Sequence, residues 1–142
     1  MKIIFLSKHF VLDNSMVPTL EKGTQLIMRR ASKRRLRRCD IVAFRIRSGH
    51  PVNQMARIIG LPGDKVELCS KTVFVNGRRL YEPYVDPQHN TYSYKSITLG
   101  PDEYWLMGDN RLTAIDSRHI GPVKLRDIPA VLLWEVKKGG NK

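Results

Sequence analysis

The sequence lacks any hydrophobic run long enough to span a lipid bilayer. A membrane-spanning helix needs roughly 18 consecutive apolar residues, whereas the first apolar run, residues 3–6, stops at Ser7 and Lys8. That run is also too short for the hydrophobic region of a secretory signal peptide. A later run, residues 130–134, has only the length of a strand. We therefore expect no membrane anchor within this chain, which would make it soluble or peripheral.

Cysteine is scarce as well. The two cysteines, Cys39 and Cys69, cannot complete a tetrahedral zinc site by themselves, so no metal or other cofactor is expected. They could form a disulfide or remain two buried thiols. For a small core, two unpaired thiols are the favoured arrangement.

Acidic residues are few relative to basic ones. The chain has 25 Lys and Arg but only 13 Asp and Glu, which gives a net charge of +12. This charge favours an anionic partner, such as phospholipid headgroups, nucleic acid or an acidic peptide.

Basic residues are concentrated from Arg29 to Arg38 (RRASKRRLRR), between two predicted strands. This segment is either a solvated, mobile loop or a contact for membrane phosphates or nucleic acid. No aromatic side chains alternate with the arginines, so base stacking, and with it nucleic acid, is not favoured. An anionic membrane surface is therefore the partner that we expect for this segment, if it has one.

The order of apolar and polar residues predicts an all-β protein. The pair Asn76-Gly77 predicts a tight hairpin turn of type I′, because both residues tolerate a positive φ. At 142 residues the chain suits one domain, for which we expect residues 1–136, followed by a disordered basic tail at 137–142. The predicted strands are residues 3–12, 25–28, 41–44, 55–59, 66–69, 72–75, 92–99, 104–107 and 130–136.

Four segments, in this order along the chain, resemble the signatures of type I signal peptidases. Residues 15–20 (SMVPTL) are similar to the nucleophile segment of that family. Residues 39–44 (CDIVAF) are similar to the strand that follows it, with Cys39 where glycine is usual. Residues 56–64 (ARIIGLPGD) resemble the strand and turn that carry the family's lysine, except at the first position. Residues 108–118 (GDNRLTAIDSR) resemble the last signature.

The resemblance implies an all-β fold with a coiled, barrel-like core. The region between the lysine-bearing strand and the last signature is short, so the extension should be a minimal β-hairpin. Asp116 and Arg118 are expected to form an ion pair, with Arg57 as a further partner. The signature residues expected to support this frame are Arg57, Gly60, Pro62, Gly63, Asp64, Gly108, Asp109, Asn110, Arg111, Asp116, Ser117 and Arg118.

The resemblance also implies a Ser-Lys catalytic pair, with Ser15 as the nucleophile and residue 56 as the base. A serine hydroxyl needs a base to activate it, and a buried, neutral lysine can serve. The residue present is Ala56, which has no titratable atom. Arg57 faces the opposite side of its strand and stays protonated, while His50 is too far away along the chain. His119, beside the last signature, is the most plausible substitute.

Two further positions depart from the family pattern. Ala114 stands where the resemblance implies a serine that helps to hold the lysine. Asp13 stands where some members have a serine that stabilises the oxyanion, and an ionised carboxylate there would repel a developing negative charge. Asp13 could instead cap a turn. Met16 and Pro18 are expected to fix the backbone around the nucleophile.

Two functions of different classes follow. The first is a serine endopeptidase that cleaves exported precursor proteins after small residues, inactive or impaired here because the lysine is missing. The second is a non-catalytic homologue that binds a peptide in the same groove, as an adaptor or chaperone in export or surface assembly. A third function, that of a self-cleaving repressor domain, is the least favoured, because that chemistry needs the same lysine. The resemblance implies a location at the outer face of the cytoplasmic membrane.

Overall fold

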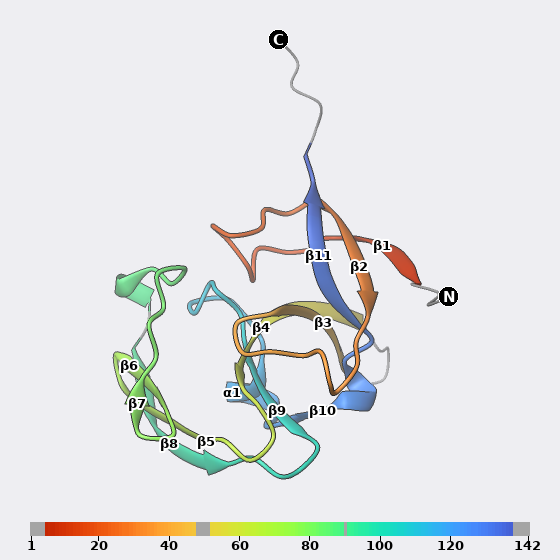
Figure 1. Cartoon of the computed structure of the whole chain (residues 1–142). Helices are drawn as coiled ribbons and strands as arrows, with labels where there is room; N and C mark the ends of the chain where they lie inside the picture. Colours follow the sequence, from red (N-terminus) through yellow and green to blue (C-terminus); the bar gives the residue numbers. More distant parts are fainter. Residues whose placement is uncertain (1–4, 48–51, 90, 138–142) are drawn as a thin grey trace.

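The computed structural model describes residues 5–47, 52–89 and 91–137, which form two antiparallel sheets (Figure 1). The larger sheet has the strand order β1 (Leu6–Phe10), β2 (Gln25–Arg30), β11 (Ala130–Val136), β3 (Ile41–Ile46), β4 (Val52–Gly60), β9 (Glu103–Met107) and β10 (Val123–Lys124). The smaller sheet has the order β7 (Arg78–Arg79), β6 (Thr72–Val75), β5 (Lys65–Ser70) and β8 (Tyr92–Thr98). The short helices are α1 (Ser117–Ile120), η1 (Pro87–His89) and η2 (Leu125–Asp127).

The all-β prediction is confirmed, and the larger sheet curves without closing into a barrel (Figure 1). Among the described residues, β1 and β10 form its two free edges. The extension contains the expected hairpin but is larger than a single hairpin. The reason is that β5 pairs with β8 on one side and with β6 on the other, which a reading of neighbouring segments does not reveal.

The hairpin turn between β6 and β7 has the expected chemistry. Asn76 has φ 53° and Gly77 has φ 79°, so both central residues are in the left-handed region that a type I′ turn requires. The Asn76 side chain accepts the backbone N–H of Lys65 and so ties the turn to the start of β5. The turn thereby helps to fix the register between β5 and β6.

Apolar side chains cover both faces of the larger sheet. On one face, Val42, Phe44 and Ile58 pack with Leu36, which comes from the basic segment between β2 and β3. On the other face, Leu26, Met28, Ala43 and Met55 pack against Val11, Met16 and Leu20 from the loop between β1 and β2. The nucleophile segment is therefore anchored to the sheet by burial of its apolar residues.

Some sequence-based boundaries differ from the structure. The first strand begins at Leu6 among the described residues, while part of its predicted range, residues 3–4, lies outside them. His50 and most of the predicted basic tail, residues 138–142, also lie outside the described residues. The strands β6 and β11 coincide with their predictions. The two-residue strands β7 and β10 and the helix α1 were not predicted, because such short elements have too little sequence pattern to be recognised.

Candidate active site

Ser15 lies in a tight turn that begins at Asp13. The backbone N–H of Ser15 donates to Asp13 Oδ1 at 2.9 Å. Asp13 thus caps the turn with its side chain, which is one of the two roles considered for it. Met16, the next residue, is fully buried, and its carbonyl accepts the N–H of Leu20 at 2.9 Å. The peptide bond before Pro18 is cis. The turn and its buried anchors thus hold Ser15 at a defined position beside the larger sheet.

The turn after β9 packs directly on Ser15. The backbone N–H of Asn110 donates to the Ser15 carbonyl at 2.9 Å, and the Asn110 side chain donates to the carbonyl of Asn14 at 3.0 Å. A Cβ atom on Gly108 would lie 2.7 Å from the Ser15 carbonyl oxygen and 2.4 Å from Ala114 Cβ. Only glycine permits this approach, so the last signature and the nucleophile segment form one unit.

Ala114 belongs to this unit, and the strand register relates Ala56 to it. The β4–β9 register pairs Arg57 with Met107 and, continued by one residue, sets Ala56 opposite Gly108. Side chains that face each other across antiparallel strands lie on the same face of the sheet. Residue 56 therefore lies on the face toward which a Cβ of Gly108 would point, at the Ser15 carbonyl and Ala114, whereas Met16 packs on the opposite face. Ala56 is completely buried, among Val42, Ile58 and other apolar residues.

The Ser15 hydroxyl has no hydrogen-bond partner among the described residues, although its oxygen is buried. His119, the most plausible substitute base, accepts instead the backbone N–H of Asp116 through Nδ1 at 3.2 Å. Arg57 is bound to Asp109. Neither side chain contacts the Ser15 oxygen.

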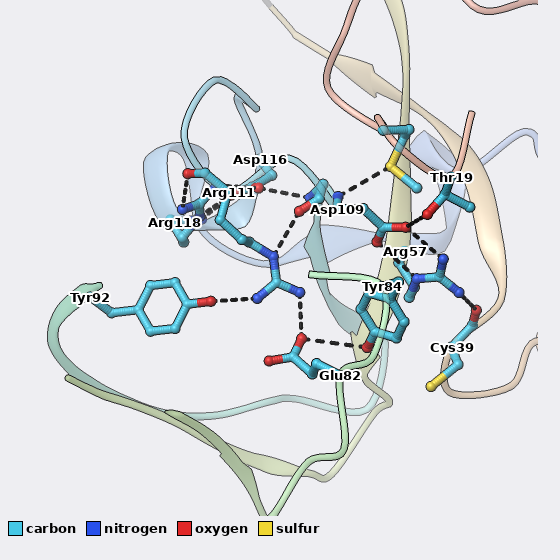
Figure 2. A network of polar contacts seen from close by, with 12 residues as sticks. Thr19, Cys39, Arg57, Glu82, Tyr84, Tyr92, Asp109, Arg111, Asp116 and Arg118 are labelled. Atoms are coloured by element: carbon cyan, nitrogen blue, oxygen red, sulfur yellow. Dashed lines mark hydrogen bonds and ion pairs between the residues drawn. The ribbon is translucent and has the colours of Figure 1, made fainter. Parts of the chain in front are cut away.

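Arg57 is the centre of a polar network on the opposite face of β4 (Figure 2). Its guanidinium donates to both carboxylate oxygens of Asp109, at 2.9 and 2.6 Å, and to the carbonyl of Cys39 at 3.0 Å. It stacks 3.9 Å from the centre of the Tyr84 ring. Asp109 also accepts the hydroxyl of Thr19. The pKa of Arg57 is raised, because these contacts with Asp109 outweigh the opposing effect of burial.

This arrangement corrects one expectation about Arg57, which pairs with Asp109 rather than with Asp116. Asp116 does pair with Arg118 as predicted, through both carboxylate oxygens at 2.9 Å. The pair forms at the start of a short helix rather than along a strand. Asp116 is the N-cap of α1, and the helical turn brings the Arg118 side chain back to it. Asp116 also accepts the N–H of Gly108 at 2.9 Å, so this pair braces the turn that contacts Ser15.

Arg111 joins the active-site turn to the smaller sheet (Figure 2). Its buried guanidinium donates to the carbonyl of Gly108 at 2.7 Å, to the Tyr92 hydroxyl at 2.6 Å and to the Glu82 carboxylate. Burial raises the pKa of Tyr92 despite the nearby positive charge of Arg111. The two sheets are thus linked through charged groups that have little contact with water.

The remaining signature residues shape the turn between β4 and β5. A Cβ on Gly60 would lie 2.6 Å from a Val66 methyl group, and Gly63 has φ 85°. Asp64 accepts the N–H of Leu61 at 2.8 Å and the Arg38 guanidinium at 2.6 Å. Pro62 lies within this turn. The turn therefore fixes the end of the basic segment as well as the start of the smaller sheet.

Both cysteines are unpaired, as favoured, but they are exposed rather than buried. Cys69 follows Val66 and Leu68 on β5, and since those two side chains point inward, alternation turns Cys69 outward. Cys39 has φ 76° at the bend before β3, which places it outside the core.

The sequence did not reveal the roles of Thr19 and Tyr92. Thr19 lies within the nucleophile segment, so its position near the site was available but its partner, ninety residues later, was not. Tyr92 had no local signal, because its contact with Arg111 depends on how the smaller sheet folds back. Among the described residues, no helix is sufficiently long and apolar to cross a membrane, and no group of His, Cys, Asp or Glu side chains is placed to hold a metal ion.

Comparison with known proteins gives a consistent result. The profile of the family described as signal peptidase, peptidase S26 matches residues 1–134. A signal peptidase I of Bacillus caldolyticus is 32% identical over 143 residues, which cover 90% of this chain and 78% of the relative. A signal peptidase I V of Bacillus subtilis (strain 168) is 33% identical over 133 residues, with 83% and 78% covered.

A solved structure agrees with the fold. The crystal structure of a signal peptidase I from Enterococcus faecalis V583 matches with a TM-score of 0.59 and 33% sequence identity, over 70% of this chain and 97% of that one. The family profile, the relatives and the solved structure all point to the same family. The chain belongs to the signal peptidase S26 family.

Proposed function

We propose that this chain is a signal-peptidase-like serine peptidase whose site binds a precursor peptide but has lost most or all of its hydrolytic activity. The observation that carries this proposal is the Ser15 oxygen, which is buried without a hydrogen-bond partner in the described part of the chain. The family resemblance implies a lysine base at position 56 of β4. The residue present there is Ala56, which is buried. Without a base, the hydroxyl cannot lose its proton as it attacks a carbonyl.

A second observation favours the non-catalytic function, in which the chain binds a peptide as an adaptor or chaperone in protein export or surface assembly. The backbone N–H of the nucleophile is a natural donor to the oxyanion that forms when serine attacks. In this chain, the Ser15 N–H donates to the Asp13 carboxylate instead. An oxyanion would have to displace this bond and would be close to a negative charge. The loss of a base and the occupation of a donor support the same conclusion.

The retained frame supports peptide binding. Met16 is buried, the turn after β9 contacts the Ser15 backbone, and Asp116 and Arg118 brace that turn. These contacts hold the Ser15 segment in place whether or not the chemistry takes place. We propose that the partner is an exported precursor protein or a peptide segment of one.

A cleavage assay on a precursor peptide tests the proposal. We expect the natural chain to be no faster than Ser15→Ala. Ala56→Lys combined with Asp13→Ser and Ala114→Ser should gain activity by about 10²-fold or more, the usual contribution of a general base. Ala56→Met in the same background fills the space without an amine and should gain nothing. Turnover by the natural chain that disappears in Ser15→Ala and that is no slower than that of the Ala56→Lys variant would contradict the proposal.

We also propose that the chain acts at the outer face of the cytoplasmic membrane and that residues 29–38 approach its anionic surface. Within this segment the guanidinium groups of Arg30, Arg34, Arg35 and Arg37 have no acidic partner among the described residues, whereas Arg38 is paired with Asp64. Unpaired cations on an exposed loop are attracted to anionic headgroups.

A further inference from the structure

A pocket of about 480 Å³ borders the nucleophile segment. Its walls come from Val17 and Pro18, immediately after Ser15, and from Asn110, whose N–H donates to the Ser15 carbonyl. Tyr84, Asp86 and His89, from the connection between β7 and β8, are also among the residues that line it. A peptide that passes Ser15 in either direction along this wall would place a side chain in the pocket.

The inner wall of the pocket is held in place before any ligand arrives. Tyr84 lies over the Arg57 guanidinium, and that guanidinium donates hydrogen bonds to both carboxylate oxygens of Asp109. Asp109 also lines the pocket, but its carboxylate is fully buried and is saturated by Arg57 and Thr19. A wall that is already ordered loses little conformational freedom on binding.

The charge that remains available in the pocket is negative. Asp109 and Arg57 neutralise each other, which leaves Asp86 at the rim with its side chain 49% exposed. Its side-chain contacts are the N–H of Gln88 at 2.9 Å and the imidazole of His89 at 3.6 Å. In a chain with a net charge of +12, this exposed carboxylate lines the same pocket as Val17 and Pro18, which follow the nucleophile.

Apolar walls with a carboxylate at the rim suit one kind of side chain. Lysine and arginine bury their aliphatic stems against apolar surface and extend the charged group to a polar rim. Val17, Pro18 and the Tyr84 ring provide that surface here, and Asp86 provides the counter-charge. We propose that this pocket is a subsite for a basic side chain of the bound peptide and that Asp86 determines this preference. The inference rests on the proposed peptide-binding function.

Binding of labelled peptides to the natural chain, measured by fluorescence anisotropy, tests the subsite without requiring hydrolysis. A lysine is moved through each position on either side of a small-residue cleavage motif and compared with norleucine and glutamate at the same position. At one position we expect lysine to bind about two- to fivefold more tightly than norleucine, as for a partly exposed ion pair. Asp86→Asn should abolish this difference, and Asp86→Lys should transfer it to glutamate.

Glu21→Gln provides a matched control, because it removes one exposed carboxylate from outside this pocket and should leave the lysine preference unchanged. The subsite is refuted if peptides bind but lysine is favoured nowhere, or if its advantage survives in Asp86→Asn. Peptide binding would stand in that case. If no peptide of the series binds, the peptide-binding function fails and the subsite fails with it.

Discussion

Ser15 and Ser117 are both buried, but among the described residues only the hydroxyl of Ser117 has a hydrogen-bond partner. Ser117 Oγ accepts the N–H of Leu106 at 2.9 Å, while the oxygen of Ser15 has no partner among the described residues. A buried polar group without a partner costs about 1–3 kcal/mol, and a satisfied one contributes to stability. The same substitution should therefore have opposite effects at the two positions.

We expect Ser15→Ala to raise the free energy of unfolding by up to about 1 kcal/mol, because it removes a buried hydroxyl and breaks no hydrogen bond of its side chain. Ser117→Ala should lower it by about 1–3 kcal/mol, because it leaves a buried N–H unpaired. Urea denaturation of both variants measures the difference. Equal losses at the two positions would show that the Ser15 hydroxyl is satisfied in solution.

Individual residues of the site were predictable to different degrees. The position of Ser15 and the close approach of Gly108 follow from short, ordered motifs that the resemblance identifies. The partner of Arg57 was predicted wrongly, because Asp109 and Asp116 are both downstream acids and the sequence does not show which one faces β4. The contact between Asp13 and the Ser15 N–H is local, and the turn-capping alternative anticipated it.

The turn between β4 and β5 depends on one carboxylate, Asp64, which joins three segments. It accepts hydrogen bonds from Leu61 in its own turn, from Arg38 at the end of the basic segment and from Asn76 in the β6–β7 turn. Burial acts to raise the pKa of Asp64, but these three donors outweigh it and the pKa lies below its ordinary value. The ionised form is thus preferred more strongly in the folded chain than in the unfolded one.

The stabilising effect of Asp64 should therefore depend on pH. A carboxyl with a lowered folded-state pKa contributes stability above its unfolded pKa, near 3.9, and that contribution is lost as the pH falls through the folded-state value. We expect Asp64→Asn to be clearly less stable than the natural chain at pH 7, and the difference to shrink at pH 3 and below. Urea unfolding at pH 7, 5 and 3 measures this. A difference that stays constant across the series would contradict it.

Strands that carry their own alternating pattern were predicted well, and the shortest elements were not. Thr72–Val75 alternates partly buried and buried residues, and its ends coincide with the prediction. The strand β10 has only two residues and exists because Val123 and Lys124 meet β9. The helix α1 is four residues long and depends on the Asp116 cap, so its residues have no repeating apolar face to detect. The pairing of β5 with β8 likewise needed the three-dimensional structure.

The molecule as a whole is organised by charged side chains that bridge its two sheets. Arg111 and Arg57 extend from the site to Glu82 and Tyr84 in the connection of the smaller sheet. Composition alone indicated the positive charge but not its division into buried and exposed parts. The buried arginines stabilise the site, whereas the exposed arginines of residues 29–38 are available to a partner.

The exposed basic segment leads to an expectation for the intact protein at a membrane. Each arginine near an anionic surface contributes about 1 kcal/mol, so Arg34→Gln with Arg35→Gln should weaken binding to phosphatidylserine vesicles by about thirtyfold. Arg78→Gln with Arg79→Gln removes the same charge from the exposed strand β7 and is the matched control. Co-sedimentation at rising salt measures the effect, and binding should decrease as screening increases. Equal losses in both double variants would indicate attraction by net charge alone. Binding that ignores salt, or that favours RNA over vesicles, would exclude this segment as a membrane contact.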